Sequence, residues 1–336
     1  MLINKLKKIS SIIALSLTLS ATVTVQSLAV ENKNTVVDNH LNYPYKVNYL
    51  DLNIENQDLK MAYMDIKPIK NDNGKSVILF HGKNFNGFYW KKTIDFLANN
   101  GYRVIVPDQI GFGKSAKPNI HYSFHLLASN NKKLLDHLNI KSVNIIAHSM
   151  GGMLGTRFSL MYPDSVDKLI LENPIGLEDY KTIVPYQDTA SLYKDELKQN
   201  EESIRNYHKT YYKEWKPEYE PLVKILVQQN EIGDFPRTAM ANALTYQMIY
   251  EQPVCYEFTN LKVNTLLVIG QLDRTVVGKA KVDKSIINQV GQYPALGKKT
   301  AKLIKNSQLL EIEGVGHIPH IEKTETFHNE ILKYLK

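Results

Sequence analysis

Cysteine is almost absent from this sequence, since Cys255 is the single cysteine in 336 residues. One thiol excludes an intramolecular disulfide framework and a zinc module built from several cysteines. Arginine is scarce and the lysines are scattered, so the formal net charge of +7 does not form the clustered basic face that nucleic-acid recognition requires. We therefore expect no nucleic-acid partner.

Long apolar runs are missing everywhere except near the N-terminus. There, three lysines precede an uncharged stretch over residues 9–30, which contains the small-x-small sequence Ser27-Leu28-Ala29. A basic head, an apolar middle and such an exit are typical of a secretory signal peptide. We predict a signal peptide over residues 1–29 and a periplasmic or extracellular protein. An uncleaved anchor is the alternative, and only then would the protein contact the membrane.

The rest of the chain has ample apolar material for a core, because 43% of all residues are hydrophobic and 10% are aromatic. Short β-branched runs alternate with helical patterns, which predicts an α/β fold with a mostly parallel eight-stranded sheet flanked by helices. Two strands are expected within residues 45–66, and the others at 76–81, 103–107, 142–147, 167–172, 264–270 and 308–312. The clearest helices are expected at 87–100, 123–137, 149–161 and 324–335.

The alternation of strand and helix stops between about residues 175 and 257. This stretch has helical spacing and holds ten of the chain's 20 tyrosines. We predict a helical cap at 175–257, inserted between two parts of the core at 30–174 and 258–336. We interpret the charges at 194–202 as solvated helix faces. The tyrosines pack half-buried between helices, line the roof of a pocket, or do both.

The segment Ala147-His148-Ser149-Met150-Gly151 follows a strand-like run and begins a helix. A serine on such a tight turn needs small residues two positions before and after it, and Ala147 and Gly151 meet that need. The turn lifts the Ser149 hydroxyl above the sheet and places the Met150 N–H at a helix start, where it can stabilise an oxyanion. Ser149 is therefore the predicted nucleophile.

A serine nucleophile needs a base, and the base needs an orienting acid. His317 lies on a turn-rich loop after the last strand, and Asp273 follows the strand before it. The carboxyl ends of parallel strands meet at one edge of the sheet, so we predict that Asp273 fixes the imidazole of His317 beside Ser149. His320 and Glu172 are the alternative base and acid. The expected role of His320 is loop packing or a surface position, and that of Glu172 is a buried structural carboxylate.

The second oxyanion donor is expected on the loop after the strand at 76–81, where the Lys83 N–H would act together with the Met150 N–H. The side chains of Lys83 and Asn84 are either solvated or line the mouth of the site. Substrate contacts are predicted for Asn84, Phe85, His148, Tyr180 and Tyr186.

No cofactor or metal is predicted. His121 and His125 lie at helical spacing but have no acidic or cysteine partners, which favours a solvated helix start. A glycine-rich phosphate-binding motif is also missing from the sequence.

Five segments together resemble the α/β-hydrolase fold superfamily, in the capped group of epoxide hydrolase-like, dehalogenase-like and perhydrolase-like enzymes. They are His81–Phe85, Pro107–Ser115, Ala147–Gly152, Gly270–Arg274 and Gly316–Glu322, spread over residues 46–334. Epoxide hydrolases and haloalkane dehalogenases use an aspartate nucleophile, and Ser149 departs from that pattern.

The residues and the resemblance together predict an exported, cofactor-free serine hydrolase. Its substrate is expected to be a small carboxylic ester or related acyl compound, cleaved through an acyl-enzyme. Carbon–carbon bond hydrolysis and perhydrolysis by the same triad are alternatives. Two further alternatives are action on lipids at a membrane surface and a non-catalytic ligand-binding protein on the same fold. No oligomeric state follows from the sequence.

Overall fold

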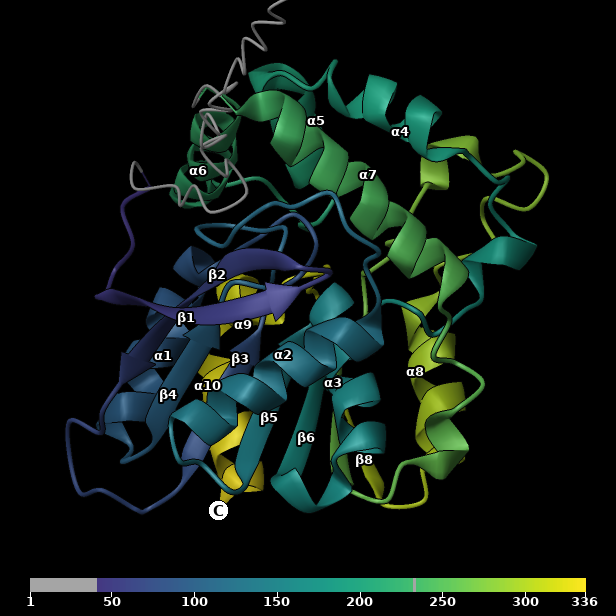
Figure 1. Ribbon diagram of the computed structural model, residues 1–336. Coiled ribbons are helices and arrows are strands. Elements are labelled where there is room, and N and C mark those ends of the chain that lie inside the picture. Colours follow the sequence, from purple (N-terminus) through teal and green to yellow (C-terminus); the bar gives the residue numbers. More distant parts are fainter. Residues whose placement is uncertain (1–40, 232–233) are drawn as a thin grey trace, which may run out of the picture. The chain divides into compact units, whose positions relative to one another are not determined.

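The computed structural model describes residues 41–231 and 234–336 (Figure 1). The predicted signal peptide at 1–29 lies outside the described residues. A single eight-stranded sheet has the strand order β1-β2-β4-β3-β5-β6-β7-β8. Its strands are β1 (Val47–Ile54), β2 (Gln57–Ile66), β3 (Ser76–Phe80), β4 (Arg103–Pro107), β5 (Val143–His148), β6 (Val166–Glu172), β7 (Asn264–Gly270) and β8 (Ser307–Ile312). Strand β2 pairs antiparallel with β1 and β4, and the other pairings are parallel, which confirms the predicted fold class.

Helices cover both faces of this sheet. The α-helices of the core are α1 (Lys91–Asn99), α2 (Phe124–His137), α3 (Met150–Met161), α8 (Tyr293–Leu303), α9 (Pro319–Glu322) and α10 (Thr324–Leu335). Short 3-10 helices lie at η2 (Gly87–Trp90), η3 (Pro163–Ser165), η4 (Tyr180–Thr182), η5 (Pro217–Tyr219), η6 (Phe258–Asn260) and η7 (Lys279–Lys281).

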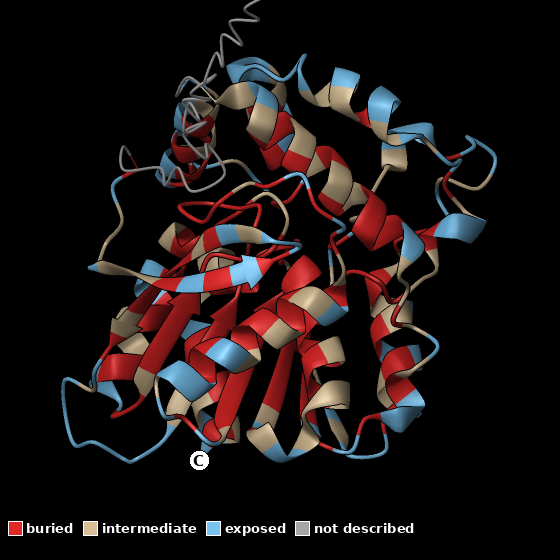
Figure 2. Cartoon of the chain, in the orientation of Figure 1, coloured by how far each residue is buried: buried red, intermediate tan, exposed pale blue. Residues whose placement is uncertain are grey.

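Alternate residues of the central strands pack into two separate hydrophobic clusters. In β3, Ile78 and Phe80 belong to the cluster that contains residues of α2, α3 and α8. Val77 and Leu79, one position along, belong to the cluster with α1 and α10. Because both faces are covered, the central strands β3, β4, β5 and β7 are almost entirely buried (Figure 2), and their sequences are mostly apolar.

Among the described residues, four α-helices form the cap, in the crossover between the neighbouring parallel strands β6 and β7. They are α4 (Thr189–Glu196), α5 (Glu201–Lys209), α6 (Glu220–Glu231) and α7 (Phe235–Glu251). Helix α4 packs on α7, and α6 packs on both α5 and α7. The cap lies at the end of the sheet where the parallel strands finish, at the top of Figure 1. Within the described ranges, no helix has the length and apolarity needed to cross a bilayer.

Candidate active site

Ser149 is the single residue between β5 and α3, and it occupies a sharp turn. Its backbone has φ +56° and ψ −120°, a left-handed conformation that residues other than glycine rarely adopt. Two backbone hydrogen bonds hold the turn: Ser149 N–H donates to the Glu172 carbonyl, and Ile175 N–H donates to the Ser149 carbonyl, both at 3.1 Å. Strain of this kind is typical of a nucleophile held at a strand-to-helix turn.

Two glycines allow the backbone to crowd around this turn. A Cβ on Gly151 would lie 2.2 Å from the carbonyl oxygen of Phe80, so α3 begins directly against the end of β3. A Cβ on Gly82 would lie 3.0 Å from the Cβ of Ser149. The loop that follows β3 is therefore in contact with the Ser149 turn.

Two backbone N–H groups beside this turn are available to an oxyanion. Met150 is the first residue of α3, so its N–H has no acceptor within the helix. In the part of the chain that the structure describes, the N–H of Lys83 makes no hydrogen bond. The helix start also carries a partial positive charge that favours a developing anion.

His317 and Asp273 form a buried pair, with each side chain 1% exposed. Nδ1 of His317 donates to Oδ2 of Asp273 at 2.7 Å. The carboxylate also accepts from the Asn173 side-chain amide at 2.9 Å and from Thr275 N–H at 2.8 Å, so it cannot turn away. With Nδ1 engaged as the donor, Nε2 is the basic nitrogen. Nε2 makes no hydrogen bond to any described residue, Ser149 included, and so remains free to accept a proton.

His148 connects the His317 loop with the loop after β3. Its Nε2 donates to the carbonyl of His317 at 2.9 Å, and its Nδ1 accepts from the Tyr89 hydroxyl at 3.1 Å. The same hydroxyl accepts from Gly82 N–H at 3.1 Å. Burial, with His317 and His320 nearby, holds the pKa of His148 well below its usual value, so one neutral tautomer satisfies the whole chain of hydrogen bonds. His148, a predicted substrate contact, does not line the cavity described below.

A second histidine–carboxylate pair lies near the first. Nδ1 of His320 is 2.9 Å and 3.0 Å from the two carboxylate oxygens of Glu172, whose Oε1 also accepts from the His320 N–H at 2.7 Å. The His320 ring stacks on Trp90, with centroids 4.2 Å apart. Both partners are buried, and they pack the base of the loop, as the sequence predicts for them.

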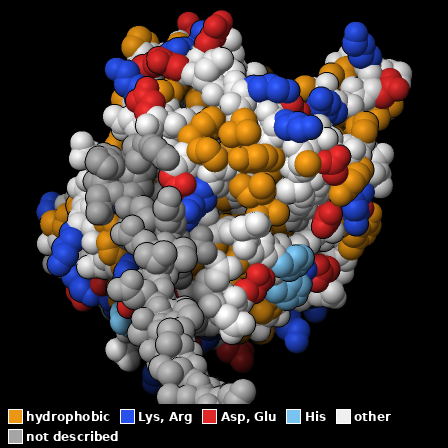
Figure 3. All heavy atoms as spheres, turned by 45° about the horizontal axis from the view of Figure 1, so that its top comes forward, with side chains coloured by type: hydrophobic (Ala, Val, Ile, Leu, Met, Phe, Trp, Pro, Cys, Tyr) orange, Lys and Arg blue, Asp and Glu red, His pale blue; other side chains and the backbone are white. Residues whose placement is uncertain are grey.

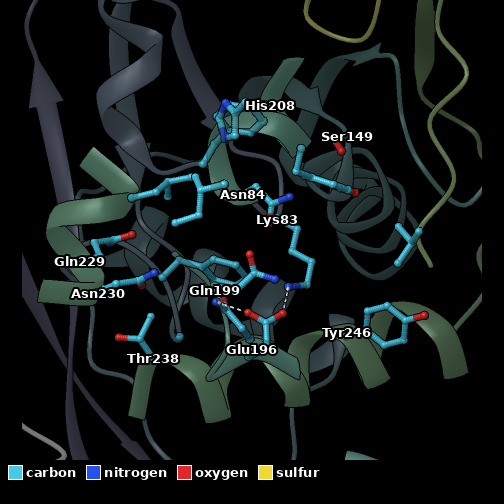
Figure 4. A pocket seen from close by; sticks show the side chains of 18 of the residues that line it. Lys83, Asn84, Ser149, Glu196, Gln199, His208, Gln229, Asn230, Thr238 and Tyr246 are labelled. Carbon is cyan, nitrogen blue, oxygen red and sulfur yellow. Dashed lines mark hydrogen bonds and ion pairs between the residues drawn. The ribbon is translucent and has the colours of Figure 1, made fainter. Parts of the chain in front are cut away.

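Ser149 opens into a cavity of about 340 Å³ between the core and the cap (Figure 4). From the core, the cavity is lined by Lys83, Asn84 and Phe85, of which Asn84 and Phe85 are predicted substrate contacts. From the cap, it is lined largely by polar side chains, including Glu196, Gln199, Ser203, Asn230, Thr238 and Asn242. The cavity therefore suits a small substrate with several hydrogen-bonding groups.

Residues 75–324 match the model of the family described as the alpha/beta hydrolase fold. This chain belongs to the α/β-hydrolase fold family. A solved structure described as a probable hydrolytic enzyme from Pseudomonas aeruginosa PAO1 is 42% identical, with a TM-score of 0.87 over 90% of this chain and 99% of that chain. An esterase from Exiguobacterium antarcticum, 19% identical with a TM-score of 0.65 over 84% of this chain and 98% of that chain, shares the fold.

Curated relatives of this α/β-hydrolase match over shorter segments. A haloalkane dehalogenase of Mycolicibacterium paratuberculosis is 32% identical over 139 residues, which are 40% of this chain and 45% of the relative. A 2-hydroxy-6-oxo-6-(2'-aminophenyl)hexa-2,4-dienoic acid hydrolase of Metapseudomonas resinovorans is 34% identical over 125 residues, 34% of this chain and 43% of the relative. The chain thus spans less than half the length of these two relatives.

The polar cavity residues of the cap were not predicted, although the sequence of this α/β-hydrolase carries a signal for them. Polar and aromatic side chains recur every four residues in and around α5 and along α7, and that spacing places them on one helix face. The two series are Gln199, Ser203, Tyr207 and Tyr211, and Thr238, Asn242 and Tyr246, all of which line the cavity. The prediction that Glu196 lies on a solvated helix face is wrong, because α4 turns this carboxylate toward Lys83 in the cavity.

The two predicted cap contacts lie elsewhere. Tyr180 is buried, and its hydroxyl accepts from Gly176 N–H at 3.2 Å without lining the cavity. Tyr186 is 62% exposed and does not line the cavity. On the outer face of the cap, hydrophobic side chains gather between charged ones (Figure 3). The remaining cap tyrosines divide between lining and packing, since Tyr207 lines the cavity while Tyr212 and Tyr219 stack with centroids 4.1 Å apart.

No group of three or more metal-binding side chains is found among residues 41–231 and 234–336. The charged groups of the cavity are instead lysine and glutamate. Nζ of Lys83 lies 3.9 Å from Oε1 of Glu196. Burial lowers the pKa of the Lys83 ammonium, and the nearby Glu196 carboxylate opposes that shift.

Proposed function

We propose that this chain is an exported serine hydrolase that cleaves a small carboxylic ester or related acyl compound through an acyl-enzyme. The observation that carries the proposal is the His317–Asp273 pair, with Nε2 of His317 unengaged, next to the strained turn of Ser149. His148 precedes Ser149 and donates to the His317 carbonyl, which supports the proposal because it links the segment of the nucleophile to the loop of the base.

In the first half-reaction, Ser149 Oγ attacks the substrate carbonyl while Nε2 of His317 takes its proton. The carbonyl oxygen becomes an oxyanion and accepts hydrogen bonds from the Met150 and Lys83 N–H groups. Each such donor contributes about 3–4 kcal/mol of transition-state stabilisation. His317 then protonates the leaving alcohol as the carbon–oxygen bond breaks. Asp273 keeps the imidazole in the productive tautomer and stabilises its charged form.

In the second half-reaction, a water molecule loses a proton to Nε2 of His317 and attacks the acyl-enzyme. The same two N–H groups stabilise the second oxyanion. Collapse of that intermediate breaks the bond to Ser149 Oγ, which recovers its proton from His317. The products are a carboxylic acid and the free enzyme.

The test is hydrolysis of p-nitrophenyl esters from acetate to palmitate, with Ser149→Ala beside the wild type. We expect turnover by the wild type, loss of at least about 10³-fold in the variant, and an optimum at short acyl chains, because the cavity is small. Ser285→Ala is the matched control, since Ser285 is exposed and lies outside the cavity. Equal rates for the wild type and Ser149→Ala would refute the proposed nucleophile.

Carbon–carbon bond hydrolysis is the second candidate, because a relative named for a hexadienoic acid hydrolase matches this chain. It uses the same triad, so turnover of a β-diketone without ester hydrolysis would favour it. Dehalogenation is disfavoured despite the haloalkane dehalogenase relative. An alkyl group on serine gives an ether, which offers no carbonyl for water to attack, whereas an aspartate ester does.

Export is the remaining part of the proposal, and it rests on the sequence pattern of residues 1–29. N-terminal sequencing of the protein from a culture fraction outside the cytoplasm tests it. We expect the mature chain to begin at Val30. Recovery of the intact N-terminus in the membrane fraction would support an uncleaved anchor instead.

A further inference from the structure

Lys83 places two different groups at the site. Its backbone N–H lies at the proposed oxyanion position, while its side chain extends across the cavity toward the cap (Figure 4). The side chain is only 13% exposed. Glu196 is the one charged partner of its ammonium in the described ranges, at 3.9 Å, and Oε2 of Glu196 is occupied by the Asn242 amide at 3.1 Å.

The Lys83 ammonium has unused hydrogen-bonding capacity. It carries three N–H donors, and a separation of 3.9 Å is an ion pair without a hydrogen bond. No hydrogen bond from Nζ to any other described residue is present. A cation held out of bulk water with free donors is costly unless an anion or strong acceptor completes it. The Lys83 ammonium is therefore suited to bind an anionic group of a ligand.

Other cavity-lining side chains also have polar atoms without partners. Both ring nitrogens of His208, Nε2 of Gln229 and the hydroxyl of Tyr246 are buried and make no hydrogen bond to a described residue. All three side chains line the cavity that contains Ser149 and Lys83. Four such atoms belong to residues of this one cavity, where a polar ligand would supply their partners.

We propose, on the basis of the function proposed above, that the substrate carries a carboxylate close to the ester that is cleaved, and that Lys83 binds it. The Lys83 N–H would hold the oxygen of the reacting carbonyl while its ammonium holds the carboxylate. Because one residue supplies both groups, the two substrate groups lie within about the length of one lysine side chain of each other. Half-esters of short dicarboxylic acids, and acyl esters of short hydroxy acids, have this spacing.

Glu196 has a defined part in this selectivity. In the absence of an anion, it neutralises Lys83, and it repels any carboxylate that enters. Its hydrogen bond from Asn242 holds the Glu196 carboxylate against α7 while the substrate carboxylate takes the free donors of Lys83. Removing the charge of Glu196 is therefore expected to strengthen the preference for a charged substrate.

The test compares charged and neutral esters of equal shape. One pair is mono-p-nitrophenyl glutarate and p-nitrophenyl 5-methylhexanoate, in which an isopropyl group replaces the carboxylate on the acyl side. The other pair, 4-acetoxybutanoate and 4-methylpentyl acetate, places the same change on the alcohol side. The measured quantity is the ratio of kcat/KM between the charged and the neutral member of each pair.

In the wild type, we expect a ratio of about tenfold or more in favour of the charged member of at least one pair. Lys83→Met should lower this ratio at least about tenfold, mainly through KM, and Lys83→Arg should preserve it. Glu196→Gln should raise it. Lys117→Met is the matched control, because Lys117 lines the same cavity and its ammonium bonds the Gly113 carbonyl at 2.7 Å. It removes the same charge and should leave the ratio within about twofold.

The outcomes separate this inference from the proposed function. Ser149-dependent hydrolysis without preference in either pair overturns the inference and leaves the proposed function standing. An equal fall of the ratio in Lys83→Met and Lys117→Met also overturns it, since the selectivity then comes from net charge. If no ester is cleaved, titration calorimetry with the mono-N-methylamide of glutaric acid and the N-methylamide of 5-methylhexanoic acid decides. Binding of the charged amide that Lys83→Met abolishes supports the inference without hydrolysis, and no binding overturns both.

Discussion

The aromatic ring of Tyr211, a cap residue, stacks on the imidazole of His317, with centroids 4.9 Å apart and planes inclined by 26°. The two residues are joined again through the backbone, where His317 N–H donates to the Tyr211 carbonyl at 2.7 Å. The Tyr211 hydroxyl in turn accepts from the Asn84 amide at 2.8 Å. One cap residue thus contacts both the proposed base and the loop that carries the proposed oxyanion donor.

Truncation of Tyr211 should therefore damage catalysis more than loss of its hydroxyl. We expect Tyr211→Ala to lower kcat about 10- to 100-fold, because the imidazole loses the ring that fixes its plane. Tyr211→Phe keeps the stacked ring and should stay within about threefold of the wild type. Steady-state kinetics on the best p-nitrophenyl ester measures both. Equal losses in the two variants would show that the stack has no part in positioning His317.

Asn173 is expected to be a positioning residue for the triad. Its amide donates to Asp273 and to the Gly316 carbonyl at 2.7 Å, and its oxygen accepts from Gly270 N–H at 2.7 Å. Asn173→Ala removes all three hydrogen bonds and takes these partners from the Gly316 carbonyl and the Gly270 N–H, so we expect a loss of about 2 kcal/mol or more in the free energy of unfolding. Denaturant unfolding measures this loss.

Measurements of activity distinguish the role of Asp273, the orienting acid, from that of Asn173, which holds it in place. Asp273→Asn should lower kcat about 10³- to 10⁴-fold with little change in stability, because the amide favours the wrong tautomer of His317. Asn173→Ala should lower kcat less than Asp273→Asn does. The reverse order would contradict the assignment of Asp273 as the orienting acid.

Hydrogen bonds link Gly82 through Tyr89 and His148 to His317, so we expect the side chains of Tyr89 and His148 to be energetically coupled. Tyr89→Phe removes the hydroxyl shared by Gly82 and His148, and we expect kcat to fall about tenfold with a small change in KM. A double-mutant cycle with His148→Gln should give a coupling energy of about 1 kcal/mol or more, since both changes break one connected network. Additive losses would mean that the two side chains act independently.

Stability should decrease in mild acid because of buried histidines. Burial lowers the pKa of both His208 and His328 to about 4, from a value near 6.5 in the unfolded chain. Above pH 6.5 both states are neutral. As the pH falls from 6.5 to 4, protonation of the unfolded state destabilises the fold, by about 1.4 kcal/mol per pH unit for each group.

This prediction is tested by unfolding His328→Gln as a function of pH. The variant can still hydrogen-bond the Thr93 hydroxyl, which lies 3.0 Å from Nε2 of His328. We expect a shallower decline of its unfolding free energy between pH 6.5 and 4. His137→Gln, a change at an exposed histidine, should reproduce the wild-type slope. An unchanged slope in His328→Gln would rule out the titration of His328 as a cause.

Much of the core was predictable from sequence. Strands β4 and β7 and helix α10 begin and end at the predicted residues. Strands buried on both faces have mostly apolar sequences, and glycine, proline or asparagine often lies at their ends. The position of Asp273 beside His317 follows from the same logic, because both residues come after neighbouring parallel strands.

The sequence predicts that the cap is helical, but it does not show which helix faces line the cavity. Polar residues recur every four positions both on a solvated helix face and on a face that lines a polar cavity. The spacing therefore does not show that Glu196 lies at the cavity. The number of aromatic residues in the cap also does not show which of them face the cavity. Tyr186 faces outward and the Tyr180 hydroxyl is occupied by Gly176 N–H, whereas Tyr207 and Tyr211 reach the cavity.

The position of the cap in the crossover between β6 and β7 has an evolutionary consequence. Two adjacent parallel strands need a long connection in any case, and each doubling of such a connection costs only about 0.6 kcal/mol in chain entropy. Descendants of this chain can therefore exchange one lid for another and inherit the sheet and its reactive groups unchanged. Tyr211 sets the condition on such an exchange: a new lid must again offer a carbonyl to the N–H of His317.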